Sequence, residues 1–326
     1  MAKPVYYGGQ ALIDGVMMQG PGGYAMAARD PNGDIVYKTG QRKMLKQKHK
    51  ILGLPFLRGI ISFAESMGVG FGALSWSAVQ AGESEEEKLT WKEIALAIVI
   101  AVALSVVVFV AVPVFLASFA LDYVGYFGRS LIEGLLRIGL FIAYIVLIRK
   151  MEDIKRVFQC HGAEHKTINA WEAGEKLTVK NVQKYTTINP RCGTSFVFMA
   201  MIMMIIVFTF IGNTTVLGRI GIKVLCMPLV VGISYEVYRL PLRFPNNIIV
   251  RVLTAPGLWL QKLTTNEPTD AQVEVAIGSL LLVPGFPGRA QNELPPRMYE
   301  EGSIKPEVSD KETPKTAVSA VTAEMP

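Results

Sequence analysis

The stretch IALAIVIAVALSVVVFVAVPVFLASFA, residues 94–120, contains no charged side chain. An α-helix needs about 20 predominantly apolar residues to cross the hydrocarbon core of a bilayer, so this stretch is long enough to span a membrane with some tilt. The whole chain agrees, since 51% of its residues are hydrophobic, 18% are charged and the mean hydropathy is +0.34. These values exceed those of an ordinary soluble domain. The sequence therefore predicts a membrane protein of mainly α class.

Three more apolar stretches are expected to span the membrane after the first one. They cover about residues 131–148, 196–211 and 220–234. Within the second stretch, Glu133 and Arg137 are spaced i, i+4 and are expected to pair near the outer end, with a functional intramembrane pair as the alternative. We therefore predict about four transmembrane helices.

The distribution of basic residues predicts the orientation of these helices. Residues 149–191 contain nine Lys or Arg, whereas the two short loops on the other side contain only Arg129 and Arg219. Because Lys and Arg concentrate in cytoplasmic loops, we expect this loop and both termini in the cytoplasm. Loops that lie against anionic lipid then account for the net charge of +6, so the lipid bilayer is the expected partner and no nucleic acid is expected. The N-terminus has no apolar segment of signal-peptide type, and the three cysteines indicate no disulfide framework.

Outside the spans, the chain is predicted to form short strands, interfacial helices and a tail. Residues 51–82 are apolar but interrupted by charges and glycines, which suits an interfacial helix or a packed helical hairpin better than a span. Residues 248–263 are amphipathic and suit the membrane surface. Thr269 and Asp270 are both suitable N-caps for a helix over 271–282.

The predicted division of the chain has seven segments. They are 1–50, a β-rich cytoplasmic segment; 51–92, an amphipathic or interfacial helical region with an acidic connector; 93–149, spans one and two; 150–195, a cytoplasmic loop; 196–234, spans three and four; 235–283, cytoplasmic or interfacial helices; and 284–326, a tail whose prolines and charges predict disorder.

The cytoplasmic loop contains HGAEH, residues 161–165, with two of the three histidines of the chain. On a helix, His161, Glu164 and His165 stand at i, i+3 and i+4 and project from one face. The pattern H-x-x-E-H is the inverted zincin signature. It predicts a divalent metal ion, with zinc as one candidate, held by His161 and His165, and Glu164 as general base on a metal-bound water. The alternative is a helix end whose histidines cap carbonyl groups or pair with Glu164.

A zincin-like site needs a further protein ligand. Glu236 follows the fourth span on the same side of the membrane and is the first candidate, with Glu172 and Cys192 as the others. Glu236 also lies one turn from Arg239, so a salt bridge at a helix end is the alternative role.

Three other residues are candidates for binding. In NPRCGTS, residues 189–195, Arg191 offers a planar donor fork for a carboxylate or phosphate, beside free amides at a helix start. Cys192 in the same turn suits a metal thiolate or a nucleophile, or else a buried structural thiol. Asp14 lies in a glycine-rich stretch that is either a packed turn or a ligand loop. Glu267 is either a solvated acidic residue or part of the site.

Several stretches together resemble the YqhQ family of bacterial membrane proteins, the domain of unknown function DUF1385. They are GGQALIDGVMM (8–18), HGAEHKT (161–167), PRCGTSF (190–196) and PGLWLQ (256–261). The resemblance covers residues 5–283 and implies a metal-dependent enzyme in the bacterial cytoplasmic membrane. The chain departs from the family pattern at Asn189, where the family usually has His, and at Asp14, where it tends to have Glu. Asn is a poor zinc ligand, so the first departure weakens the case for zinc.

Two functions follow as hypotheses. The first is a metal-dependent hydrolase at the cytoplasmic membrane face. The second is a non-enzymatic membrane-protein assembly or scaffold factor whose cytoplasmic cap binds a protein or small-molecule partner. A transporter is less well supported, because the spans carry few polar residues and no inverted repeat is visible.

Overall fold

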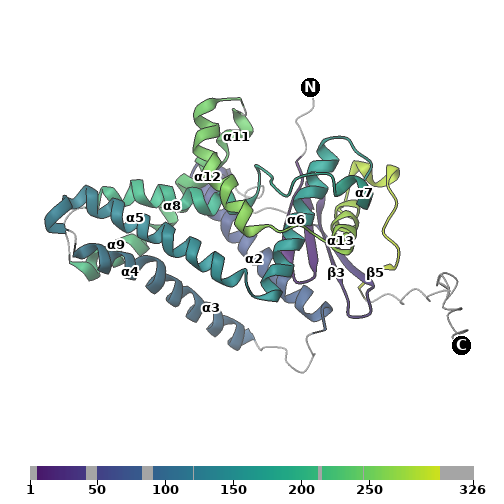
Figure 1. The fold of residues 1–326 in the computed structure, drawn as a ribbon, viewed down its shortest axis with the longest axis horizontal. Helices are drawn as coiled ribbons and strands as arrows, with labels where there is room; N and C mark the ends of the chain where they lie inside the picture. Colours follow the sequence, from purple (N-terminus) through teal and green to yellow (C-terminus); the bar gives the residue numbers. More distant parts are fainter. Residues whose placement is uncertain are drawn as a thin grey trace, which may run out of the picture.

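The computed structural model describes residues 6–41, 50–82, 91–119, 121–211, 215–244 and 246–301. A small β-sheet with helices on both faces lies beside a group of longer helices (Figure 1). This agrees with the predicted mainly α class and its β-rich N-terminal segment. The acidic connector at 83–87 and the tail beyond residue 301 fall outside the described residues.

Five strands form the sheet in the order in which they occur in the chain. β1 (Gly8–Leu12), β2 (Gly15–Gly20), β3 (Gly23–Arg29) and β4 (Ile35–Gly40) pair antiparallel, and β5 (Met298–Glu300) pairs parallel with β4. The glycine-rich stretch forms the β-hairpin of β1 and β2. Its turn places Asp14 at a φ of 45°, a left-handed conformation that Asp tolerates better than most residues.

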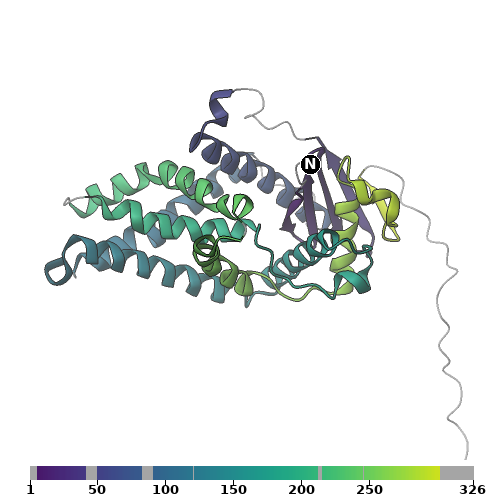
Figure 2. The same cartoon turned by 90° about the horizontal axis from the view of Figure 1, so that it is seen from above.

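Helices cover both faces of the sheet (Figure 2). Val16, Met18 and Ala25 pack against α6 (Glu152–Glu172) and α13 (Asp270–Leu281) on one face. Leu12, Met17 and Met26 pack against α2 (Leu57–Gln80) on the other. Successive strand residues point to opposite faces, so the apolar run at 16–18 reflects burial on both sides.

The expectations for residues 51–82 and for the helix after residue 270 are both resolved. Within residues 51–82 the chain forms one long helix, α2, after the 3₁₀ turn Lys50–Gly53, and not a hairpin. Thr269 is the N-cap of α13 and forms a capping box with Gln272, as the capping pattern predicted.

The prediction of a disordered tail from residue 284 is wrong for residues 284–301. This segment forms the 3₁₀ helix Pro287–Gln291 and β5, and Phe286 is 5% exposed in contact with Tyr7 and Trp171. Its average composition is polar, but its few apolar side chains lie at the positions that meet the sheet and α6.

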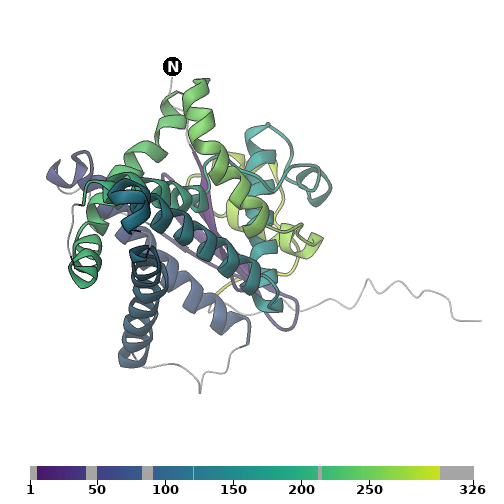
Figure 3. The same ribbon diagram turned by 60° about the vertical axis from the view of Figure 1, so that its left-hand side comes forward.

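The long helices include two that are apolar and long enough to span a membrane, among the described residues. They are Ala95–Ser118, with a mean hydropathy of 3.2, and Phe127–Ile148, with a mean hydropathy of 2.2. The first runs through α3 (Trp91–Val106), the π-helical turn Val107–Ala111 and α4 (Val112–Ser118), and the second lies in α5 (Leu121–Ile148). α5 and α8 (Gly193–Thr209) pack side by side (Figure 3).

The expected fourth span is not one straight helix. Residues 216–238 form α9 (Val216–Leu225) and α10 (Met227–Tyr238), which bend by 49° at Cys226. Pro228 at the start of α10 has no N–H to continue the helical hydrogen bonds, which explains the break. These two helices are long and apolar enough for a third span only if they are counted as one segment. The chain then continues through α11 (Leu240–Arg243) and α12 (Ile248–Thr264), which packs on α8.

Buried charges hold α5 and α9 together. Glu133 accepts hydrogen bonds from Arg219 at 2.9 Å, contacts Arg129 at 3.4 Å and pairs with Lys223. Arg137 does not pair with Glu133 as expected, but donates to the carbonyl oxygen of Phe109 at 2.7 Å. Pro113 lies four residues after Phe109 and has no N–H to donate to that carbonyl.

We expect Glu133→Gln to destabilise the helical part strongly, because it leaves buried cations without their anion. Breaking a buried ion pair on one side costs about 3–5 kcal/mol. The midpoint of thermal unfolding in detergent should fall well below that of Glu267→Gln, which changes a carboxylate that is 75% exposed. Equal midpoints for the two variants would contradict this role of Glu133.

Candidate metal centre

Helix α6 presents His161 and His165 from one side, as the i, i+4 spacing predicted. Their ring centroids lie 4.4 Å apart. The helix is buried on two sides, with Cys160 and Ala163 in the core against the sheet. On the other side it meets the segment after α12 and the chain that leads to α8.

Cys192 reaches the histidines from the start of α8. It is the N-cap residue of that helix, and its Sγ accepts a hydrogen bond from the backbone N–H of Thr194 at 3.4 Å. The distance from Sγ to Nε2 of His161 is 3.1 Å. Gln261 of α12 holds the turn in place by accepting from the N–H of Asn189 and donating to its carbonyl oxygen, at 2.9 and 2.8 Å.

Backbone carbonyl groups fix the tautomer of both histidines. Nδ1 of His161 lies 2.8 Å from the carbonyl oxygen of Thr264, and Nδ1 of His165 lies 2.5 Å from that of Thr187. A carbonyl oxygen only accepts, so each Nδ1 carries the proton and each neutral ring keeps its lone pair on Nε2. Metal-binding histidines are commonly oriented in this way by an acceptor behind the ring.

The three donor atoms fit a soft divalent metal ion. The ligand atoms of His161, His165 and Cys192 all lie within 4.8 Å of one another. Two ligands of one tetrahedral zinc lie roughly 3.5 Å apart, so small side-chain rotations would bring them into range. His165 is 1% exposed, and its Nε2 has no hydrogen-bond partner in the described part of the chain. Imidazole and thiolate are ligands that zinc prefers.

Glu164 lies beside this group but points toward the sheet. Burial raises the pKa of Glu164 to about 7, against the opposing effects of His161 and of a hydrogen bond from the backbone N–H of Gly9. A side chain at position 9 would place its Cβ 2.4 Å from the carbonyl oxygen of Met17 and 3.0 Å from Cδ of Glu164. Gly9 therefore makes room for the carboxyl group.

The other predicted site residues are paired elsewhere. Glu236, the first candidate for the further ligand, accepts from Nε of Arg58 at 2.7 Å and lies outside the group of three. Arg191 pairs with Glu172 and lies over the ring of Tyr6 at 4.9 Å.

Asp14 contacts Arg156 at 3.2 Å, and Glu267 contacts Lys166 at 2.6 Å. The structure thus brings Cys192 to the histidines and holds the four carboxylates in ion pairs.

Residues for which the sequence predicted no role support the centre. The carbonyl groups of Thr187 and Thr264 carry no sequence signal, since every residue has one. Gln261 ends the stretch PGLWLQ that carries the family resemblance, but no role was predicted for its side chain. Asn189 had a readable signal, because Asn before Pro favours a side-chain turn, and its Oδ1 accepts from the N–H of Arg191 at 2.9 Å.

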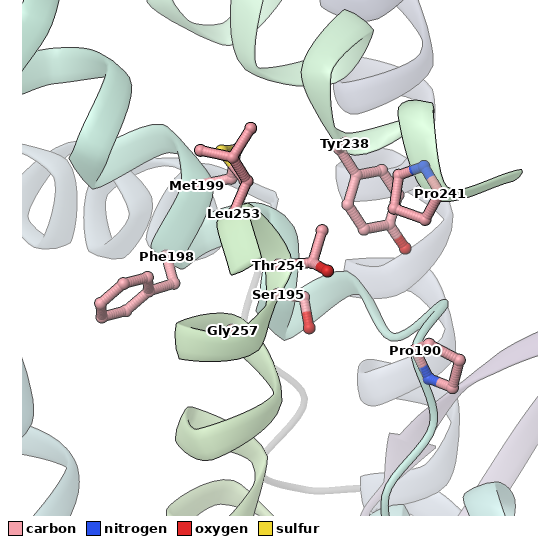
Figure 4. A pocket seen from close by; sticks show the side chains of 9 residues that line it. All are labelled: Pro190, Ser195, Phe198, Met199, Tyr238, Pro241, Leu253, Thr254 and Gly257. Atoms are coloured by element: carbon pink, nitrogen blue, oxygen red, sulfur yellow. The ribbon is translucent and has the colours of Figure 1, made fainter. Parts of the chain in front are cut away.

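A small apolar pocket adjoins the turn of Cys192 (Figure 4). Pro190 and Ser195 form one wall, and Tyr238, Leu253 and Gly257 of α10 and α12 form the others. Helices α8 and α12 approach closely here, since a Cβ at Gly257 would lie 2.9 Å from Cβ of Ser195. None of the three candidate ligands lines this pocket.

Comparison with known proteins supports the resemblance that the motifs suggested. The family model described as "Protein of unknown function (DUF1385)" matches residues 54–284, which include all three residues of the centre. The uncharacterized protein YqhQ of Bacillus subtilis (strain 168) is 37% identical over 290 residues, covering 85% of this chain and 91% of that protein. No solved structure matches the chain.

We expect Gly9→Ala to destabilise the protein, because the new methyl group meets backbone at Met17 and the buried carboxyl of Glu164. Gly8→Ala is the matched control, since nothing lies within 4 Å of its Cβ position. The thermal unfolding midpoint should fall for Gly9→Ala and stay near that of the unmodified protein for Gly8→Ala. The same midpoint for both variants would show that β1 and α6 do not approach as closely as described.

Proposed function

The chain belongs to the DUF1385 family, and on this premise we propose that it is a membrane protein that binds a divalent metal ion, with zinc the best fit, at His161, His165 and Cys192. The observation that carries this proposal is the buried Nε2 of His165, which has no hydrogen-bond partner among the described residues. A ring nitrogen of each histidine and Sγ of Cys192 lie within 4.8 Å of one another. An unpaired buried polar atom is costly. A metal ion would give all three lone pairs a partner.

The chemistry that fits this centre best is hydrolysis near the cytoplasmic membrane face. A zinc ion with three protein ligands keeps one position for water and activates it as a nucleophile. The carboxyl group of Glu164 lies against Gly9 of the sheet, and in this proposal it would accept a proton by turning toward His161, which already affects its pKa of about 7. The carbonyl groups of Thr187 and Thr264 would keep both rings oriented throughout.

Membrane insertion with both termini in the cytoplasm completes the proposal. Apolar side chains cover the outside of the long helices, among them Val99, Leu104 and Leu217, which are 63%, 61% and 80% exposed. The basic residues of 149–191 lie at the opposite end, next to the sheet. The helices α3–α4, α5, α8 and α9–α10 would then form four spans, in the cytoplasmic membrane of a bacterium.

A scaffold role is the second candidate, and a specific surface favours it. Ile248, Ile249, Val252 and Trp259 on α12 are between 65% and 68% exposed. An apolar face of this kind suits the membrane surface or a membrane-protein partner. Metal content separates the two functions, because a scaffold does not require the metal centre.

Elemental analysis of the full chain, purified in detergent without chelators, tests the centre directly. We expect about one equivalent of metal, as for a three-ligand site, and loss of the metal in His161→Ala/His165→Ala and in Cys192→Ser. Glu164→Gln should keep the metal, and Cys226→Ser, outside the group, is the matched control. With Co²⁺ as probe, Cys192→Ser should lose the thiolate charge-transfer absorption. A metal-free unmodified protein would exclude the centre, and retention of metal and spectrum by Cys192→Ser would remove Cys192 from it.

The proposed orientation predicts which side of the membrane reacts with an impermeant maleimide. In a Cys226→Ser background, Leu217→Cys should be labelled on intact cells, because this position is 80% exposed and lies at the outer end. Lys180→Cys, on the exposed helix α7 (Val179–Val182), should be labelled only after lysis. The reverse pattern would invert the topology.

A further inference from the structure

A second buried group of charges lies away from the metal centre, where α9 meets α5. We define the basic cluster as Arg137, Arg219 and Lys223, whose exposed fractions are 3%, 0% and 0%. Helix α9 lies at the end of the molecule that is farthest from the sheet (Figure 1). The cluster is therefore separate from the residues that hold the metal.

The cluster has more positive charge than its one described carboxylate can balance. Glu133 faces Arg219 and Lys223 with both of its oxygens, so among the described side chains the three basic groups of the cluster exceed the one carboxylate by two. The excess does not depend on Arg129, which also contacts Glu133. Burying charge without a counter-ion costs several kcal/mol per ion.

Some N–H groups of the two arginines in the cluster also have no hydrogen-bond acceptor among the described residues. Arg219 gives Nε to Glu133 and Nη2 to Ser130, both at 2.9 Å, but its Nη1 has no partner among the described residues. Arg137 gives Nε to the carbonyl oxygen of Phe109, and its Nη2 has no partner there either. These groups are too buried for bulk water to satisfy them.

The ring of Phe208 joins the cluster into one unit. Cζ of Arg137 lies 5.6 Å from the ring centroid and Nζ of Lys223 lies 5.0 Å from it. An aromatic face attracts cations but carries no net charge. The ring therefore holds the cations near one another without balancing them.

We propose that the basic cluster binds an oxyanion of the phosphate class. Arginine presents a planar fork of donors that matches phosphate oxygens, and the pairing of charged donor and acceptor makes such hydrogen bonds strong. The surface around α9 is apolar, with Leu217 and Leu225 80% and 81% exposed. A lipid headgroup in the outer leaflet and a free phosphate ion are the two sources of this chemistry.

The test uses the full chain, purified in detergent and freed of bound lipid. Its thermal unfolding midpoint is measured with phosphatidylglycerol in mixed micelles and with inorganic phosphate, against phosphatidylcholine and chloride as references. We expect one of the two phosphate probes to raise the midpoint, and the responding probe identifies the source. No response to either probe beyond its reference would overturn the proposal.

Arg137→Gln tests the residues without disturbing the ion pairs of Glu133. We expect its response to need a roughly tenfold higher concentration of the probe, as for the loss of a charge-assisted hydrogen bond. Arg251→Gln, on the exposed side of α12, should respond like the unmodified protein. A variant Arg137→Gln that folds and responds normally would overturn the assignment, and Lys223→Gln provides a second test if Arg137→Gln does not fold.

Discussion

The close approach of α6 to the chain on both of its sides determines where the candidate metal centre lies. On one side Gly9 of β1 leaves room for Glu164, and on the other Gly162 lies against the backbone of Asn266, where a Cβ would come 2.1 Å from its carbonyl oxygen. The N–H of Asn266 donates to the carbonyl oxygen of Phe158 at 2.9 Å. Because this segment runs directly along the helix, the carbonyl of Thr264 reaches Nδ1 of His161. The glycine inside HGAEH is therefore a packing requirement of the centre.

Two constraints of a low-dielectric interior explain the polar contacts of the long helices. Pro113 has no N–H for the carbonyl of Phe109, and Arg137 of α5 donates to that carbonyl. Glu133 of α5 forms ion pairs with Arg219 and Lys223 of α9, and these pairs hold the two helices together. Neither contact lies near the sheet. The candidate metal centre and the basic cluster thus rest on separate sets of interactions.

The local parts of the fold could be predicted from local patterns. The β-rich start of the chain, the cap at Thr269 and the apolar helices each depend on neighbouring residues in the chain. The predictions were wrong where the structure depends on contacts between residues that are far apart in the chain. Arg58 of α2 forms an ion pair with Glu236. Phe286 packs against Tyr7 and Trp171 and so anchors a segment whose composition is polar. The break at Cys226 was readable from Pro228, but an apolar average over the stretch concealed it.

By itself the sequence determined that the chain has apolar helices, a β-rich start and a helical face with two histidines, since spacing and hydropathy act over a few residues. It also carried the family membership, because the family's motifs lie in order along it. Only the tertiary structure decided that Cys192 joins the histidines, that Thr187 and Thr264 set their tautomers and that Glu133 pairs with α9 and not with Arg137. Each of these contacts joins residues that are far apart in the chain, and packing of the helices and the sheet is what brings them together.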